Sequence, residues 1–201
     1  MTPTLNVYAL PRLVEPEKLA GGTVVVIDVL RASTTIIHAL EAGAREIIPC
    51  LEVDEARAIA SQLPEGEAIL GGEREGSPIE GFDLGNSPSE YLPHVVDGKA
   101  VVFTTTNGTK AMAQVRAADR ILIGAFVNVS AVFKELVDQQ QIHLVCAGTA
   151  GHISQDDVLL AGMLVERLVR EGGLLYEQNA QAITAREAWL HSFALPRALG
   201  A

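Results

Sequence analysis

Short apolar runs rich in β-branched residues recur along this chain, and segments with helical periodicity separate them. The run Thr23–Ile27 precedes a helical pattern over Thr34–Ala42, and Ala100–Phe103 precedes one over Thr109–Ala117. Apolar runs of about four to eight residues are typical of strands buried on both faces, and the helices between them supply the crossovers that parallel strands need. We therefore predict an α/β fold, a three-layer α/β/α sandwich with a largely parallel or mixed sheet.

Further elements continue this alternation. We predict strands at Glu46–Pro49, Ala68–Leu70, Arg120–Ile123 and Ile142–Cys146, and helices at Val53–Gln62, Val129–Asp138, Val158–Val169 and Arg186–Phe193. Residues 71–98 contain too much Gly and Pro for a regular element, and we expect them to form an ordered lid or wall over a site.

Two stretches of the chain are weakly similar to each other. Ile47 aligns with Ile121 and Asp54 with Asn128, each pair being 74 residues apart. We interpret the similarity as two βαβαβ halves, residues 23–98 and 99–172, within a single domain of residues 1–201. Chance similarity between two ordinary α/β stretches is the alternative.

The charge and the cysteines limit compartment and partners. The chain has 25 acidic residues against 15 Lys and Arg, a formal net charge of −10, which opposes nonspecific binding to nucleic acid or to an anionic membrane. Its two cysteines, Cys50 and Cys146, stand far apart, so we expect reduced thiols. No apolar stretch approaches the ~20 residues that span a bilayer, and no signal-peptide pattern is present. We expect a cytoplasmic protein with no nucleic-acid or membrane partner.

Polar clusters follow several predicted strands, where loops of a parallel sheet converge on one ligand site. They contain Asp28, Arg31, Ser33 and Thr34; Glu73 and Arg74; and Thr105, Thr106, Asn107, Gly108, Thr109 and Lys110. Loops of this composition that open helices expose backbone N–H groups, which favour phosphate, sulfate or carboxylate. For either loop alone an ordinary N-cap is the simpler interpretation, but two such loops, each with a cation, favour an anion site.

Several carboxylates are candidate ligands for Mg²⁺, which usually takes one or two carboxylates with waters and substrate phosphate oxygens. They are Asp28, Glu73, Asp83, Asp156 and Asp157. Asp156 and Asp157 also suit the first turn of a helix, where carboxylates stabilise the helix dipole without a metal. Asp28 ends a buried strand, and an unpartnered buried carboxylate is costly. Of the five histidines, only His152, in a Gly/Ser loop, suits an acid or base.

Taken in chain order, five strings of residues resemble the 2-phosphosulfolactate phosphatase family. They are Val26–Thr35, Gly72–Arg74, Gly81–Pro88, Thr105–Thr109 and Cys146–Gly148, within roughly residues 5–170. The resemblance implies a single phosphatase domain that releases phosphate from 2-phosphosulfolactate with Mg²⁺, yielding sulfolactate for coenzyme M biosynthesis. The family's Glu-Asp pair near the last helix is Asp156-Asp157 here, and the tail after about Gly172 resembles the family poorly.

The resemblance also suggests roles for individual residues. We expect catalytic roles for Asp28, Arg31, Glu73 and Arg74, and Mg²⁺ ligation by Asp28, Glu73, Asp83 and Asp157. The substrate-binding residues would be Ser33, Thr34, Asn86, Ser87, Thr105, Thr106, Asn107, Gly108 and Thr109. Whether water attacks directly or Asp28 forms a phospho-aspartyl intermediate stays open.

Two other functions fit the same residues. One is a phosphatase of another phosphorylated hydroxy acid, since specificity would lie in residues 79–87, where the sequence gives no pocket shape. The other is a noncatalytic binder of anionic metabolites. In each case the partner is a small anionic molecule, phosphorylated if the protein is an enzyme, and a homo-oligomer is left open.

Overall fold

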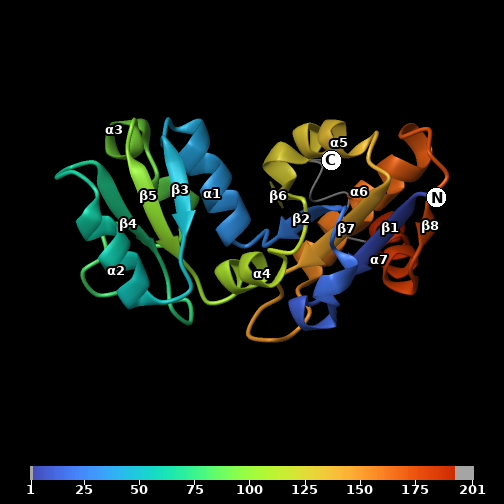
Figure 1. The fold of residues 1–201 in the computed structure, drawn as a ribbon, viewed down its shortest axis with the longest axis horizontal. Helices are drawn as coiled ribbons and strands as arrows, with labels where there is room; N and C mark the ends of the chain where they lie inside the picture. Colours follow the sequence, from blue (N-terminus) through green and yellow to red (C-terminus); the bar gives the residue numbers. More distant parts are fainter. Residues whose placement is uncertain (1, 193–201) are drawn as a thin grey trace.

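The computed structural model describes residues 2–192 and contains two parallel β-sheets that lie side by side (Figure 1). The five-stranded sheet has the order β6-β2-β7-β1-β8, and the three-stranded sheet has the order β3-β5-β4. The strands are β1 Thr4–Tyr8, β2 Thr23–Ile27, β3 Glu46–Pro49, β4 Ala68–Gly72, β5 Ala100–Thr104, β6 Arg120–Gly124, β7 Gln141–Cys146 and β8 Glu177–Gln178. The predicted α/β class and parallel pairing are confirmed, with the strands divided between two sheets.

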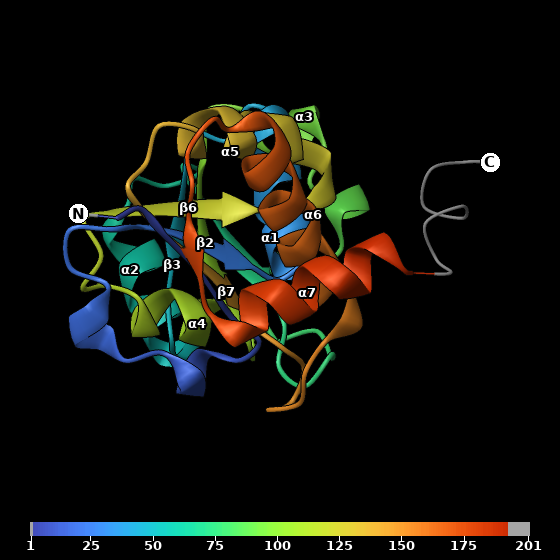
Figure 2. The same ribbon diagram turned by 90° about the vertical axis from the view of Figure 1, so that its right-hand side faces the viewer.

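Helices cover both faces of each sheet. They are α1 Ala32–Glu41, α2 Val53–Gln62, α3 Pro93–Val96, α4 Gly108–Gln114, α5 Val129–Leu136, α6 Gln155–Glu171 and α7 Ala180–Leu190, with 3-10 turns at Pro11–Leu13, Pro16–Lys18, Pro88–Glu90 and Phe126–Asn128. In β2, Val25 packs in the core formed with α5, α6 and α7, and Val24 in the core formed with α4. In β5, Val101 packs with α1 and α3, and Val102 with α2. Figure 2 shows α6 and α7 over the larger sheet. Each sheet is therefore the middle layer of an α/β/α sandwich.

The first strand of each predicted half lies in the sheet formed by the other half. β2 belongs to residues 23–98 but lies between β6 and β7. β5 belongs to residues 99–172 but lies between β3 and β4, which is the equivalent position. The halves 23–98 and 99–172 therefore each contribute strands to both sheets, and the single domain of residues 1–201 stays a prediction.

Some elements differ from the sequence-based expectation. β1 was not predicted, because Thr4 and Asn6 interrupt its apolar residues on one face. α7 begins at Ala180, because the Asn179 side chain caps the helix by accepting a hydrogen bond from the Ala182 N–H at 2.8 Å. The predicted helix Arg186–Phe193 thus starts too late, and Phe193 lies outside the described residues. Between residues 2 and 192, the structure contains no helix with the length and apolarity required to cross a membrane.

The Gly/Pro-rich segment lies along the outer edge of β4. Leu84 forms a parallel bridge with Gly71, and its N–H donates to the Leu70 carbonyl at 3.1 Å. The Asn86 carbonyl accepts a hydrogen bond from the Thr35 hydroxyl on α1 at 3.3 Å. The segment is therefore ordered, and it joins the edge of the smaller sheet to α1.

His143 is a buried titratable group in β7, with 1% of its surface exposed. Its ring stacks on Tyr8, whose hydroxyl lies 3.4 Å from Nδ1, and the Gln141 Nε2 lies 3.1 Å from its Nε2. Burial lowers the pKa of His143 to about 4. Folding therefore holds this ring neutral.

Replacing His143 by Gln is expected to reduce the loss of stability in acid. Between pH 6.5 and about 4, His143 is neutral in the folded protein but takes up a proton when the protein unfolds. The stability that the neutral ring contributes is therefore complete above pH 6.5 and is lost as the pH falls towards 4. The free energy of unfolding should fall less steeply in the variant, by up to about 1.4 kcal/mol per pH unit. Urea unfolding across this range measures the slope. The exposed His38→Gln is the control, and equal slopes in wild type and H143Q would contradict the prediction.

Candidate active site

The two segments in which the chain leaves β2 and β5 meet at the first residues of α1 and α4. A Cβ atom built on Gly108 would lie 2.7 Å from the Cβ of Ala32 and 2.8 Å from Oδ2 of Asp28. These separations are shorter than van der Waals contact, so only glycine fits at this position. The Asp28 carboxylate therefore lies where the two helices begin.

Asp28 follows β2 and is 7% exposed. Its Oδ1 accepts a hydrogen bond from the Ala32 N–H at 3.2 Å, and its own N–H donates to the Ser33 hydroxyl at 3.0 Å. The Thr34 hydroxyl donates to the Val29 carbonyl at 2.6 Å. The predicted substrate-binding hydroxyls of Ser33 and Thr34 thus hold the loop around Asp28.

Burial dominates the electrostatics of Asp28. Burial is the main cause that raises the pKa of the Asp28 carboxyl to about 6. The negative charges of Asp156 and Glu73 also raise this pKa, whereas the hydrogen bond from the Ala32 N–H lowers it. Asp28 therefore belongs to a group of acidic side chains whose charges disfavour one another.

Asp157, on the first turn of α6, is 2% exposed and joins two loops. Its Oδ1 accepts a hydrogen bond from the Val29 N–H at 2.8 Å, and its Oδ2 accepts one from the Gly148 N–H at 3.0 Å. Burial, with the charge of Asp28, raises its pKa to about 7 against these hydrogen bonds. Both of its oxygens are thus committed to the backbone that follows β2 and β7.

The neighbouring Asp156 is bonded differently. The Ser154 hydroxyl donates to its Oδ1, whereas its Oδ2 is buried without a hydrogen-bond partner. A buried carboxylate oxygen without a donor is costly unless a cation binds it. The family resemblance implied Asp157 of this pair as a ligand. The first-turn position suits both residues equally and shows nothing of their partners.

Glu73 joins the loops that follow β4 and β5. Its Oε1 accepts a hydrogen bond from the Thr106 N–H at 2.7 Å, and its Oε2 accepts bonds from the Thr106 hydroxyl at 3.0 Å and the Gly76 N–H at 2.7 Å. Thr109 closes the same loop by donating from its hydroxyl to the Thr105 carbonyl at 2.7 Å. The 105–109 segment is therefore fixed by side chains before any ligand binds.

The two predicted catalytic arginines have different surroundings. Arg74 donates to the Leu51 carbonyl at 2.5 Å, to the Thr104 hydroxyl at 2.6 Å and to the Glu73 carbonyl at 3.0 Å, so its guanidinium holds the protein together. Arg31 precedes α1 and is exposed, and its side chain forms no hydrogen bond or ion pair with any of the residues 2–192.

Three predicted site residues, Asp83, Asn86 and Ser87, lie on the segment at the edge of β4. Asp83 is exposed, and its Oδ2 accepts a hydrogen bond from the Leu70 N–H at 2.8 Å. It lines a surface cavity with residues of α2, whereas the charges that raise the pKa of Asp28 are those of Asp156 and Glu73. The Ser87 hydroxyl lies 3.0 Å from that of Ser89. Asn86 is closer to α1, and its buried Oδ1 has no hydrogen-bond partner.

The carboxylates around Asp28 suit a Mg²⁺ site better than a zinc site. In the part of the chain that the structure describes, no group of three or more His, Cys, Asp or Glu side chains is placed to hold a metal ion. Zinc takes three or four protein ligands, whereas Mg²⁺ needs one or two carboxylates and completes its shell with water and phosphate oxygens. The Asp156 oxygen that has no hydrogen-bond partner, together with the nearby Asp28 carboxylate, fits a Mg²⁺ site of this kind.

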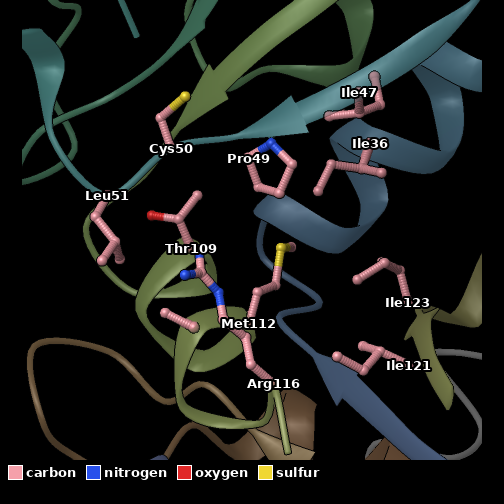
Figure 3. Close-up of a pocket in the computed structure, with 11 residues that line it drawn as sticks. Ile36, Ile47, Pro49, Cys50, Leu51, Thr109, Met112, Arg116, Ile121 and Ile123 are labelled. Atoms are coloured by element: carbon pink, nitrogen blue, oxygen red, sulfur yellow. The ribbon is translucent and has the colours of Figure 1, made fainter. Parts of the chain in front are cut away.

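A cavity of about 250 Å³ between the two sheets has a different character (Figure 3). Its wall includes Ile36, Met112 and Ile123, and among the described residues that line it Arg116 alone is charged. Burial raises the pKa of the Cys50 thiol in this wall to about 11, which makes it a poor nucleophile. The chemistry of the site therefore lies at the carboxylates.

The chain is similar to known proteins that share one description. A family model described as 2-phosphosulpholactate phosphatase matches residues 8–199, which includes the tail after Gly172 that the motifs do not cover. A protein of Caldanaerobacter subterraneus subsp. tengcongensis, described as a probable 2-phosphosulfolactate phosphatase, is 44% identical over 165 residues, 82% of this chain and 68% of that protein.

Two further proteins have the same description. The one from Clostridium beijerinckii is 44% identical over 146 residues, 72% of this chain and 61% of its own length. The one from Thermotoga petrophila is 47% identical over 148 residues, 74% of this chain and 63% of its own length. The matched region therefore spans less than two thirds of the length of these two curated relatives.

Replacing Asp157 by Asn is expected to lower the free energy of unfolding by about 1–3 kcal/mol, because an amide has one acceptor oxygen where two backbone N–H groups need two. Replacing the adjacent Asp156 by Asn is expected to leave the free energy of unfolding unchanged or higher, since a like charge near Asp28 is removed. Urea unfolding of both variants tests the contrast. An equal loss of stability in the two would contradict it.

Proposed function

We propose that this chain, which belongs to the 2-phosphosulfolactate phosphatase family, hydrolyses the phosphate ester of 2-phosphosulfolactate to sulfolactate and phosphate. The observation that carries the proposal is the group of buried carboxylates around Asp28, with one Asp156 oxygen left without a partner. Such a group is stabilised by a divalent cation, and a phosphate ester supplies the remaining oxygen ligands.

The family points to a metal-dependent enzyme, and we propose Mg²⁺ as its metal. Asp28 and Asp156 would hold it, because Glu73 and Asp157 have both oxygens bonded to the protein and Asp83 lies at the edge of β4. When bound, Mg²⁺ supplies positive charge to the phosphoryl oxygens as a Lewis acid. The sequence-based expectation that Glu73, Asp83 and Asp157 are also ligands stays a prediction.

The other residues prepare the site. Glu73 positions Thr106, and Arg74 positions Thr104 and the segment after β3. Arg31 follows Asp28 by three residues, and its side chain has no hydrogen-bond partner among residues 2–192. It would neutralise charge that develops on the phosphoryl group. Preorganised donors of this kind stabilise a transition state because they need not reorient when charge moves.

Other expectations from the sequence stay predictions. These are the cytoplasmic location, the place in coenzyme M biosynthesis, a homo-oligomeric state and the substrate-binding roles of Ser33, Thr34, Asn86, Ser87 and Thr105 to Thr109. The proposed partner is a small phosphorylated substrate, as the family indicates.

The purified protein is expected to release phosphate from 2-phosphosulfolactate in the presence of Mg²⁺. EDTA should abolish this activity, and added Mg²⁺ should restore it. Phosphate release is measured directly, and 2-phospholactate serves as a parallel substrate. A folded protein that turned over neither compound and kept its ligand in EDTA would be a binder of anionic metabolites, and the proposed activity would be wrong.

Replacing Asp156 by Asn is expected to lower kcat/KM for phosphate release by about 100-fold or more and to raise the Mg²⁺ concentration needed, without loss of stability. Asp54→Asn is the matched control, since Asp54 lies in the first turn of α2 and is exposed. Activity of D156N close to that of wild type would remove Asp156 from the proposed metal site.

A further inference from the structure

A second cavity, of about 310 Å³, lies beside the carboxylates. Its lining includes Arg12, Thr106, Asn107, Lys110, Ala147 and Gly151. Arg12 comes from the 3-10 turn after β1 and Lys110 from α4, so the cavity joins segments distant in sequence. Neither the sequence-based site nor the proposed metal site includes Arg12.

The cavity and the carboxylates share two loops. Asn107 lines the cavity and precedes Gly108, which packs against the Asp28 carboxylate. Ala147 lines it and precedes Gly148, whose N–H donates to Asp157. A ligand held at Asp28 by one end therefore has the cavity next to it, because in each loop the lining residue immediately precedes the glycine that contacts a carboxylate.

The charge of the cavity is positive in an acidic chain. Arg12 and Lys110 are both exposed, and no Asp or Glu lines the cavity. Neither cation forms an ion pair with a residue in the range 2–192, whereas Arg45, Arg57 and Arg120 each pair with a carboxylate. Within the described residues, the Arg12 side chain donates one hydrogen bond, from Nη1 to the Gly151 carbonyl at 3.0 Å. Its other donors and those of Lys110 have no partner among these residues and are available to an anion.

We propose that Arg12 and Lys110 bind the sulfonate of the substrate and determine the enzyme's preference for a sulfonated ester. The inference rests on the proposed function. In 2-phosphosulfolactate the carboxylate is on the carbon that carries the phosphate, whereas the sulfonate is on the next carbon. The sulfonate therefore reaches furthest from a phosphate held at Asp28, and its three oxygens accept hydrogen bonds from both a guanidinium and an ammonium group.

The test compares kcat/KM for 2-phosphosulfolactate and 2-phospholactate, which lacks the sulfonate. Arg12→Ala and Lys110→Ala are each expected to lower the value for the sulfonated ester by about tenfold to 100-fold, since each removes a charged hydrogen bond. The value for 2-phospholactate should change by less than about twofold. Lys134→Ala, an exposed lysine on α5, is the matched control. Equal losses on both esters, or no loss on either, would overturn the proposal.

A binding measurement separates this proposal from the proposed activity. Sulfolactate, with lactate as the control ligand, is expected to raise the melting temperature of the wild-type protein but not of R12A or K110A. Arg12→Gln keeps an N–H donor for the Gly151 carbonyl but removes the charge, and it should lose the shift, which a role limited to the Gly151 contact would retain. If sulfolactate raised the melting temperature only when both Arg12 and Lys110 were present, but neither ester was hydrolysed, the sulfonate subsite would be supported and the proposed phosphatase activity refuted. If the wild-type protein hydrolysed 2-phosphosulfolactate and R12A and K110A did so with the same kcat/KM, only the sulfonate subsite would be refuted.

Discussion

The close contact between Gly108 and Ala32 is the constraint on which the rest of the structure depends. A single Cβ atom on Gly108 would overlap both Ala32 and the Asp28 carboxylate. Because glycine stands there, the starts of α1 and α4 come together, and the loops after the central strands of the two sheets meet. The exchange of β2 and β5 between sheets places both chain crossings at this one point, where Asp28 lies.

Carboxylates hold the loops around this contact in place. Glu73 binds the backbone after β5, and Asp157 binds the backbone after β2 and β7. Their acceptor oxygens satisfy N–H groups that would otherwise be buried without partners. The same arrangement gathers negative charge next to Asp28, which raises the pKa of its carboxyl and leaves the group to be neutralised by a cation. The same carboxylates thus hold the loops in place and supply the negative charge that a metal cation would neutralise.

Local patterns predicted most of the secondary structure, because the buried strands are continuous apolar runs and the helices are periodic. β1 was missed since Asn6 and Thr4 make one of its faces polar. Among the candidate metal ligands, sequence position did not separate Asp156 from Asp157, because the two share the first turn of α6. Asp83 was grouped with Asp28 by motif, but its carboxylate holds the Leu70 N–H on the edge of the smaller sheet.

The sequence by itself determined the α/β class, the parallel strands and the family to which the chain belongs, because each depends on short runs of neighbouring residues. Only the tertiary structure decided which sheet each strand joins and which acidic oxygens are already bonded. These properties arise from pairings between distant segments: the Val29 N–H meets the Asp157 carboxylate across 128 residues of chain. Such a hydrogen bond leaves no periodic pattern in the sequence, since its two partners are brought together by the packing of the strands between them.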